Sequence, residues 1–311
     1  MFSKFKLSWY KMALPLTLLG LLVAFSFFIP FFFSSQNLSN ILVASAPLII
    51  LASGAALVIG SGGIDLSIGA ILSFSTCLAG ALMVKFNVGG EWVIFICLLA
   101  GIGVGFMNGL ISALTVIPAF IVTIATMSIF RGLSYILTDG ETIYGLPPEI
   151  IWLGQGNLLN IPNPVILAII SVIVFQIILK KTAFGNHISA YGDNPSATYA
   201  MGVNILTLKV KIYALSGLTG ALAGLIFMGR LNTIDPTSGQ MIEMAAVTAA
   251  IIGGVKLSGG QTTIMGAMIG ALLIGVVQNG LNLMAISGFY QYIAIGFILL
   301  ITVVFQPKRI K

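Results

Sequence analysis

The chain has 311 residues, of which 58% are hydrophobic and only 7% are charged, and its formal net charge is +6. A soluble domain typically carries about 25% charged residues. The composition therefore excludes a soluble globular protein and predicts an all-α chain that crosses a membrane many times. The basic excess does not by itself indicate binding to nucleic acid, because its meaning depends on where Lys and Arg fall between the apolar segments.

Ten apolar segments, separated by Gly, Pro and polar residues, are predicted to be membrane spans. They cover residues 12–33, 41–60, 66–84, 92–115, 118–137, 164–180, 210–229, 243–255, 262–284 and 287–305. The first is long enough to cross a hydrocarbon core of ~30 Å and lacks a small-residue cleavage site, so we expect an uncleaved helix. The segment 243–255 is the shortest, which leaves open whether it crosses fully or forms a half-helix or re-entrant segment.

The distribution of basic residues predicts that both termini are cytoplasmic. With the first span leaving the cytoplasm, all 14 Lys and Arg residues except Lys85, Arg131 and Arg230 fall on the cytoplasmic side. Such an excess follows the positive-inside rule and favours contact with anionic lipid. The whole chain, 1–311, is then one membrane domain, with an extracytoplasmic loop at 138–163 and a cytoplasmic loop at 181–209 that is too short for a nucleotide-binding domain.

A short glycine-rich pattern occurs twice, as G-G-I-D-L-S-I-G at 62–69 and G-G-V-K-L-S-G-G at 253–260. Both copies fall at predicted cytoplasmic turns, which suggests a weak parallel repeat. Asp65 is expected at a water-accessible end, where it either caps the next helix or takes part in gating. We hypothesise that the two turns approach each other and pair Asp65 with Lys256. The turn residues are Gly62, Gly63, Asp65, Ser67, Gly253, Gly254, Lys256 and Ser258.

The sequence lacks the usual signatures of catalysis and of metal binding. It contains no H-E-x-x-H, G-x-S-x-G or Walker A pattern, its two cysteines lie in apolar runs and its single histidine is isolated. Uncharged polar residues inside spans instead suit a path for a neutral, hydroxylated solute, although each of them could equally form a helix–helix hydrogen bond. The candidates for that path are Asn108, Thr123, Thr126, Gln278, Asn279 and Asn282.

Several long motifs occur in an order that resembles a known family. They are G-G-I-D-L-S-I-G, N-G-L-I at 108–111, P-A-F-I-V-T-I-A-T-M-S-I-F-R-G-L at 118–133, G-D-N-P-S-A-T-Y-A-M-G-V-N-I at 192–205, M-G-R-L-N at 228–232, and the stretch from G-G-V-K-L-S-G-G to G-L-N-L-M within 253–284. Together they resemble the permease subunits of ribose-type ABC sugar importers over about residues 40–305.

The resemblance implies a type II importer fold and a non-catalytic transport subunit in the bacterial cytoplasmic (inner) membrane. The implied partners are a cytoplasmic ATP-binding subunit that carries ATP and Mg, an extracytoplasmic solute-binding protein for a monosaccharide or small polyol, and a second permease that is either a copy or a paralogue. No cofactor is implied on this chain. The related permeases for autoinducer-2 fall within the same group.

The resemblance also assigns roles to two loops. An ATPase-coupling segment of short helices is implied at Asn186, Gly192, Asp193, Asn194, Pro195, Ala197, Gly202 and Asn204. Outer docking residues for the binding protein are expected among Asp139, Glu141, Arg230, Asp235 and Glu243. This chain has Ala245 where the family often has an acidic residue, so any role of that acid is in doubt here.

Three alternatives remain open at this stage. A related ABC permease for branched-chain amino acids would share the architecture but carry zwitterions. An ion-coupled secondary transporter would need no ATPase, and the sequence offers none of the buried acids that such carriers usually use. A membrane scaffold or enzyme would not move solute at all.

Overall fold

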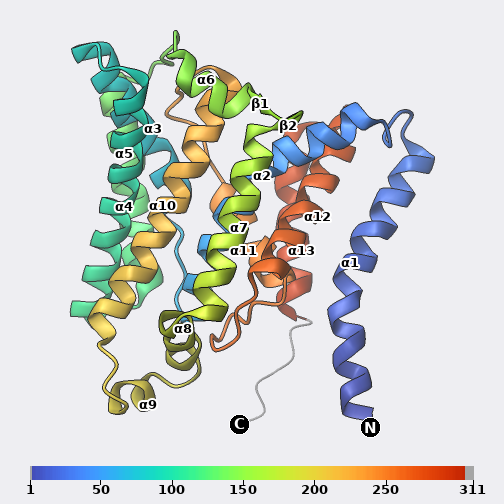
Figure 1. Cartoon of the computed structure of the whole chain (residues 1–311), viewed down its shortest axis with the longest axis vertical. Helices are drawn as coiled ribbons and strands as arrows, with labels where there is room; N and C mark the ends of the chain where they lie inside the picture. The colour runs from blue at the N-terminus through green and yellow to red at the C-terminus, as the bar shows by residue number, and fades with distance from the viewer. Residues whose placement is uncertain (1, 305–311) are drawn as a thin grey trace.

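The computed structural model describes residues 2–304, with side chains from residue 14 onward. The described chain is almost entirely helical, as predicted (Figure 1). The elements are α1 (Phe2–Phe28), α2 (Ser35–Gly60), α3 (Ile68–Phe86), α4 (Gly90–Leu114), α5 (Ala119–Thr138), α6 (Pro148–Gln155), β1 (Asn157–Leu158), β2 (Ile161–Pro162), α7 (Asn163–Lys181), α8 (Ala183–Asp193), α9 (Pro195–Ala200), α10 (Ile205–Leu231), α11 (Ile242–Ile252), α12 (Ile264–Leu283) and α13 (Gly288–Val304).

Each of the ten predicted spans contains one apolar helix. Within the described residues, seven helices are long and apolar enough to cross a membrane, and the three others are the shorter apolar stretches Leu14–Phe28, Ile242–Ile252 and Gly288–Val304. The all-α polytopic fold is therefore confirmed. The positions of Lys308, Arg309 and Lys311 lie outside the described residues, as do the side chains of Lys4, Lys6 and Lys11.

Helix α11 resolves the question left by the segment 243–255. It has 11 residues, so at 1.5 Å per residue it is about 16 Å long, roughly half of a hydrocarbon core. The preceding residues 232–241 supply the other half as irregular chain that descends beside α3. Along this descent Ile234 meets Gly80, the carbonyl of Pro236 accepts a hydrogen bond from Ser73, and Gly239 packs against Gly69.

A second irregular stretch, residues 61–67, enters the bundle from the opposite end. It leaves α2 at Gly60 and follows α10, since Gly63 lies against Tyr213, Asp65 bonds Ser216, and the carbonyl of Ile68 lies next to Gly220. Non-helical backbone at membrane depth is tolerated only where protein buries it. Asp65 and Ser67 in the first stretch and Ile234, Pro236 and Gly239 in the second are buried, whereas Gln240 and Met241 at the end of the second are exposed. Helix α2, the most buried of the seven long spans, runs through the middle of the bundle.

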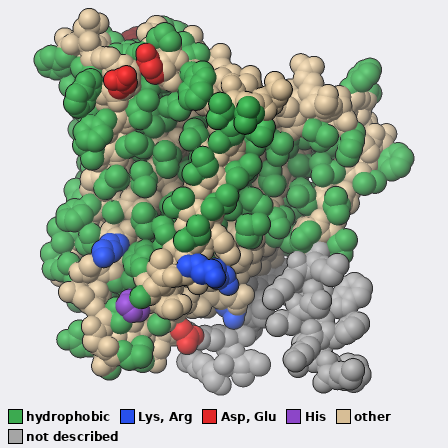
Figure 2. Space-filling view, in the orientation of Figure 1, with side chains coloured by type: hydrophobic (Ala, Val, Ile, Leu, Met, Phe, Trp, Pro, Cys, Tyr) green, Lys and Arg blue, Asp and Glu red, His purple; other side chains and the backbone are tan. Residues whose placement is uncertain are grey.

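The two ends of the bundle differ in chemistry. Helix α6 and the β1–β2 hairpin cover one end, whereas α8, α9 and the start of α1 lie at the other (Figure 1). Figure 2 shows a largely apolar belt between them, with acidic side chains near the α6 end and, near the α8 end, Lys and Arg side chains together with a further acidic one. We call the α8 end the inner end and the α6 end the outer end, after the sides predicted from the distribution of basic residues.

Candidate functional site

Asp65 forms the centre of a buried hydrogen-bond network. Its Oδ1 accepts bonds from the backbone N–H of Ser67 at 2.9 Å and from the Ser67 hydroxyl at 2.6 Å, and its Oδ2 accepts one from the Ser216 hydroxyl at 2.7 Å. The amide of Asn108 donates to Ser67 Oγ at 2.8 Å. The network therefore links the irregular stretch 61–67 to α4 and α10.

The expectation that Asp65 is accessible to water is wrong. The residue is 1% exposed, because residues 61–67 turn back into the bundle instead of staying at its inner end. The capping role is also modified: Asp65 holds Ser67, which itself precedes α3 as the N-cap residue. Burying a carboxylate is costly unless it is hydrogen-bonded, and here three donors meet it.

The two glycine-rich turns do approach each other, but not through the predicted charge pair. The backbone N–H of Gly260 donates to the carbonyl of Gly60 at 2.9 Å. The Lys256 side chain is exposed, and it forms no ion pair with the buried Asp65. Gly62 at the start of one turn and Lys256 and Ser258 in the other are exposed, whereas the first turn continues into the bundle through Asp65 and Ser67; Gly63 follows α2, and Gly253 and Gly254 follow α11.

Helix α8 closes this inner junction. A Cβ on Gly192 would overlap the carbonyl oxygen of Gly60 and the amide nitrogen of Gly260. A Cβ on Gly259 would in turn lie only 2.7–3.0 Å from backbone atoms of Gly192. Three chain segments that are distant in sequence thus touch backbone to backbone at Gly60, Gly192 and Gly260, which we call the glycine junction.

The inner loop forms the short helices expected for it. The Asn194 side chain caps α9 by accepting from the N–H of Ala197 at 3.0 Å, and Pro195 occupies the first turn, where its missing N–H costs nothing. Gly202 has a left-handed φ of 81°, which ends α9. Asn204 caps α10 through the N–H of Thr207. Asn186, Asp193 and Ala197 are exposed at this end.

Exposed apolar side chains accompany these caps. Tyr199 is 74% and Met201 69% exposed although both lie outside the predicted spans. Tyr191 on α8 is half-buried, with Lys209 Nζ 5.9 Å from its ring centroid, and burial raises the pKa of its hydroxyl. The α8–α9 surface thus combines a rigid backbone with apolar groups that face away from the bundle.

The residues expected at the outer end fall into two classes. Asp139 and Glu141 are exposed beside the end of α5, and Asp235 is partly exposed, with its Oδ1 accepting from the N–H and hydroxyl of Thr237 at 2.7 Å. Glu243 is not available for docking: it is 7% exposed, because the first turn of α11 lies inside the bundle and its carboxylate packs on Gly69.

The descending stretch 232–241 is secured by a basic residue on α5. The guanidinium of Arg131 donates to the carbonyl of Ser238 at 2.8 Å and to those of Pro236 and Gly239 at 3.4 Å. A guanidinium offers five donors in a fixed plane, so one side chain of α5 satisfies several carbonyls of a loop that packs on α3 from the other side. Sequence reasoning placed Arg131 at the outer side but missed this role, because the loop's descent left no periodic signal.

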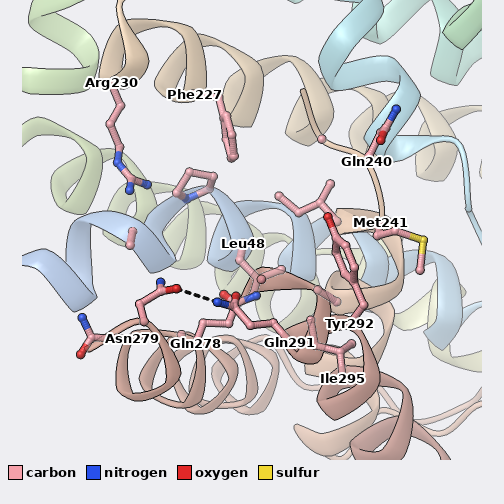
Figure 3. A pocket seen from close by; sticks show the side chains of 18 of the residues that line it. Leu48, Phe227, Arg230, Gln240, Met241, Gln278, Asn279, Gln291, Tyr292 and Ile295 are labelled. Carbon is pink, nitrogen blue, oxygen red and sulfur yellow. Dashed lines mark hydrogen bonds between the residues drawn. The ribbon is translucent and has the colours of Figure 1, made fainter. Parts of the chain in front are cut away.

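A cavity of about 570 Å³ opens near the outer end, between α2, α10, α12, α13 and the start of α11 (Figure 3). It contains three of the six candidates for the solute path, Gln278, Asn279 and Asn282. The other three lie elsewhere: Asn108 joins the Asp65 network, while Thr123 donates to the carbonyl of Ile64 and Thr126 to that of Thr123. Asn108 and Thr123 are therefore buried supports of the irregular stretch 61–67, whereas the Thr126 hydroxyl bonds only within α5.

Comparison with known proteins gives the family of this chain. Residues 37–303 match the family model described as branched-chain amino acid transport system / permease component. The ribose import permease protein RbsC of Bacillus subtilis is 38% identical over 291 residues, which cover 93% of this chain and 90% of that protein. The chain belongs to the ribose-type ABC importer permeases.

Other relatives of the permease point the same way. RbsC of Haemophilus influenzae is 39% identical, with 93% of this chain and 90% of that protein covered. The autoinducer 2 import system permease protein LsrC of Photorhabdus laumondii is 33% identical, with 89% and 83% covered. The solved structure of PsaBC from Streptococcus pneumoniae in complex with Fab shares the fold, with a TM-score of 0.52, 15% identity and 90% and 95% coverage.

Proposed function

We propose that this permease is the membrane subunit of an ATP-driven importer that receives a monosaccharide or similar small polyol from an extracytoplasmic solute-binding protein. The support comes from relatives whose names specify ribose and L-arabinose, at 31–39% identity over most of the chain. The family model is described by branched-chain amino acids, so an amino-acid substrate is the second candidate and must be tested beside the sugars.

The observation that carries the proposal is the glycine junction beneath an exposed α8–α9 surface. Helix α9 presents Tyr199 and Met201 outward, and α8 touches Gly60 and Gly260 behind it. Exposed apolar groups outside the lipid belt indicate a protein interface. We assign this surface to a separate cytoplasmic ATPase that carries ATP and Mg, since the chain has no Walker A pattern of its own.

The glycine junction suggests how closure of the ATPase upon ATP binding is coupled to the membrane-spanning part of the permease. ATP favours the closed form of an ATPase pair, and that preference shifts the population of whichever permease state fits it. A displacement of α8 must carry Gly60 and Gly260 along, because closely packed backbones leave no gap into which one could move alone. Gly60 leads into the stretch that holds Asp65, and Gly260 leads into α12, which lines the outer cavity.

The remaining partners follow from the same reasoning. The exposed acids Asp139 and Glu141 are proposed contacts of the binding protein at the outer end. A second permease, identical or paralogous, covers part of the apolar face of α5 and α13, where Ile129, Ile136 and Phe297 are exposed. We assign both termini to the cytoplasm of a bacterial cell, with the permease in the inner membrane.

The test is reconstitution with the ATPase and binding protein encoded beside this chain. Proteoliposomes that contain all components are expected to import D-ribose or L-arabinose with ATP inside, and vanadate is expected to stop it. Import of leucine with no import of either sugar would favour the amino-acid candidate. Uptake that persists in the absence of the ATPase, driven by an ion gradient, would refute the importer altogether.

A further inference from the structure

The outer cavity differs from the rest of the bundle in its polar groups. Six amide side chains line it, from four separate elements: Asn40 on α2, Gln240 before α11, Gln278, Asn279 and Asn282 on α12, and Gln291 on α13. None of the six is fully buried: Asn40, Gln240 and Asn282 are exposed, and Gln278, Asn279 and Gln291 are partly exposed, so a solute that enters the cavity can reach them. A cluster of this kind is typical of a site that binds polar ligands.

Some of these amides are already paired and others are not. Asn279 exchanges two hydrogen bonds with Asn37, at 2.9 and 3.0 Å, and Gln291 donates to Asn282 at 2.6 Å. Among the described residues, the side chains of Gln278 and Asn40 have no hydrogen-bond partner in the chain. The paired amides give fixed walls, and the unpaired ones leave donors and acceptors for a bound molecule.

The chemistry of the lining selects the class of that molecule. No acidic residue is among those that line the cavity, so a metal cation finds no carboxylate, and Arg230 is the single basic one. An amide offers both donors and an acceptor, which matches a hydroxyl group that also does both. Phe227, Tyr292 and Leu48 add apolar surface against which the C–H faces of a ring can pack (Figure 3).

The backbone adds to the site. Met241 has a left-handed φ of 63°, and α11 begins immediately after it without a side-chain cap, at the wall of the cavity. A volume of about 570 Å³ also falls within the range of about 300–1,000 Å³ that small-molecule sites occupy.

We infer that this cavity is a solute subsite within a single permease, which holds a small uncharged polyhydroxylated molecule through Gln278, Asn40 and their amide neighbours. This inference rests on the proposed function and adds to it a place where the solute pauses after release from the binding protein. The subsite lies at the outer end, opposite α8 and α9, and its lining residues come from this chain.

The test is cysteine protection in the full-length permease in lipid nanodiscs. Gln278→Cys and Asn40→Cys place thiols in the cavity, whereas the native Cys77 and Cys97 are buried and do not react. Leu159→Cys, at an 88% exposed position of the outer hairpin, is the control. The probes are D-ribose and L-arabinose, with cyclopentanol as a ring of similar size and one hydroxyl, and a membrane-impermeant methanethiosulfonate reports the labelling rate.

At least one sugar is expected to slow labelling of both cavity variants by the factor 1 + [L]/Kd, with no effect on Leu159→Cys. Ligand-observed NMR of the same sugar with wild-type permease is expected to show binding that Gln278→Leu removes, which covers the case that a cysteine variant folds poorly. Equal protection by cyclopentanol, or no protection by a sugar that the complete system imports, overturns the subsite. Protection without any ATP-dependent import refutes the proposed function and leaves the subsite standing.

Discussion

Replacement of Asp65 tests whether its network holds the irregular stretch 61–67 in place. In Asp65→Ala, three donors lose their acceptor: the N–H and hydroxyl of Ser67 and the hydroxyl of Ser216. A buried group left without a partner costs about 1–3 kcal/mol, so the loss is at least about 3 kcal/mol. At roughly 2 °C per kcal/mol for a chain of this size, the midpoint of thermal unfolding in detergent falls by about 6 °C.

Asp65→Asn is the matched variant. It removes the charge and its desolvation cost as well, but keeps an acceptor for both Ser67 donors, and the Ser216 hydroxyl can turn to accept from the new amide. The midpoint of Asp65→Asn is therefore expected to stay within about 2 °C of wild type, which corresponds to ~1 kcal/mol. Equal midpoints for the Ala and Asn variants would refute the claim that Asp65 stabilises the stretch 61–67 through its hydrogen bonds rather than through its charge.

Three further substitutions address the coupling surface and the descending loop. Gly192→Ala forces apart the backbones of the glycine junction, which costs about 1–3 kcal/mol, and should lower the amount of sugar imported per ATP hydrolysed. Gly103→Ala, whose Cβ would have no atom within 4 Å, is the control and should leave this ratio unchanged. An unchanged ratio in Gly192→Ala would contradict the coupling role of the junction. Ala197→Trp, at an exposed site, should change the free energy of unfolding by no more than about 0.5 kcal/mol but abolish co-purification of the ATPase. Retained co-purification would argue against docking of the ATPase at this site. Arg131→Met removes charged hydrogen bonds of about 1.5–3 kcal/mol each and should speed amide hydrogen exchange in residues 232–241. Lys85→Met, which removes an exposed cation, is the control. If exchange in Arg131→Met is no faster than in Lys85→Met, Arg131 does not hold the loop in place.

The helical framework could be predicted from the sequence because lipid leaves the backbone few choices. Apolar runs bounded by Gly and Pro predicted all ten apolar helices to within a few residues at most ends. Two stretches were exceptions: residues 61–67, which were expected at a water-accessible turn, and the region before α11, where the sequence 232–241 is polar enough to resemble a surface loop. Its descent depends on Arg131 and on the small faces of Gly69 and Gly80, and none of these contacts leaves a periodic pattern.

The candidate sites could be predicted only in part, because their partners are remote in sequence. Asp65 was identified as unusual, but Ser216 lies 151 positions away, so neither its burial nor its bonds could be inferred. The amides of α12 were identified as polar residues in a span, and in the structure they line the outer cavity. Gln291 was missed although it also lies within a predicted span, and Asn40 was missed because it directly precedes one.

The glycine junction separates what this permease can vary from what it must keep. We have proposed that the outward face of α9 binds the ATPase, so its side chains are free to change when that partner changes. Behind it, Gly60, Gly192 and Gly260 touch without side chains, and a larger residue at Gly192 would fit only if Gly60 and Gly260 moved away. Exchange of the residues around Tyr199 between two such permeases should therefore be enough to exchange the ATPases that they bind, with the glycine junction left unchanged.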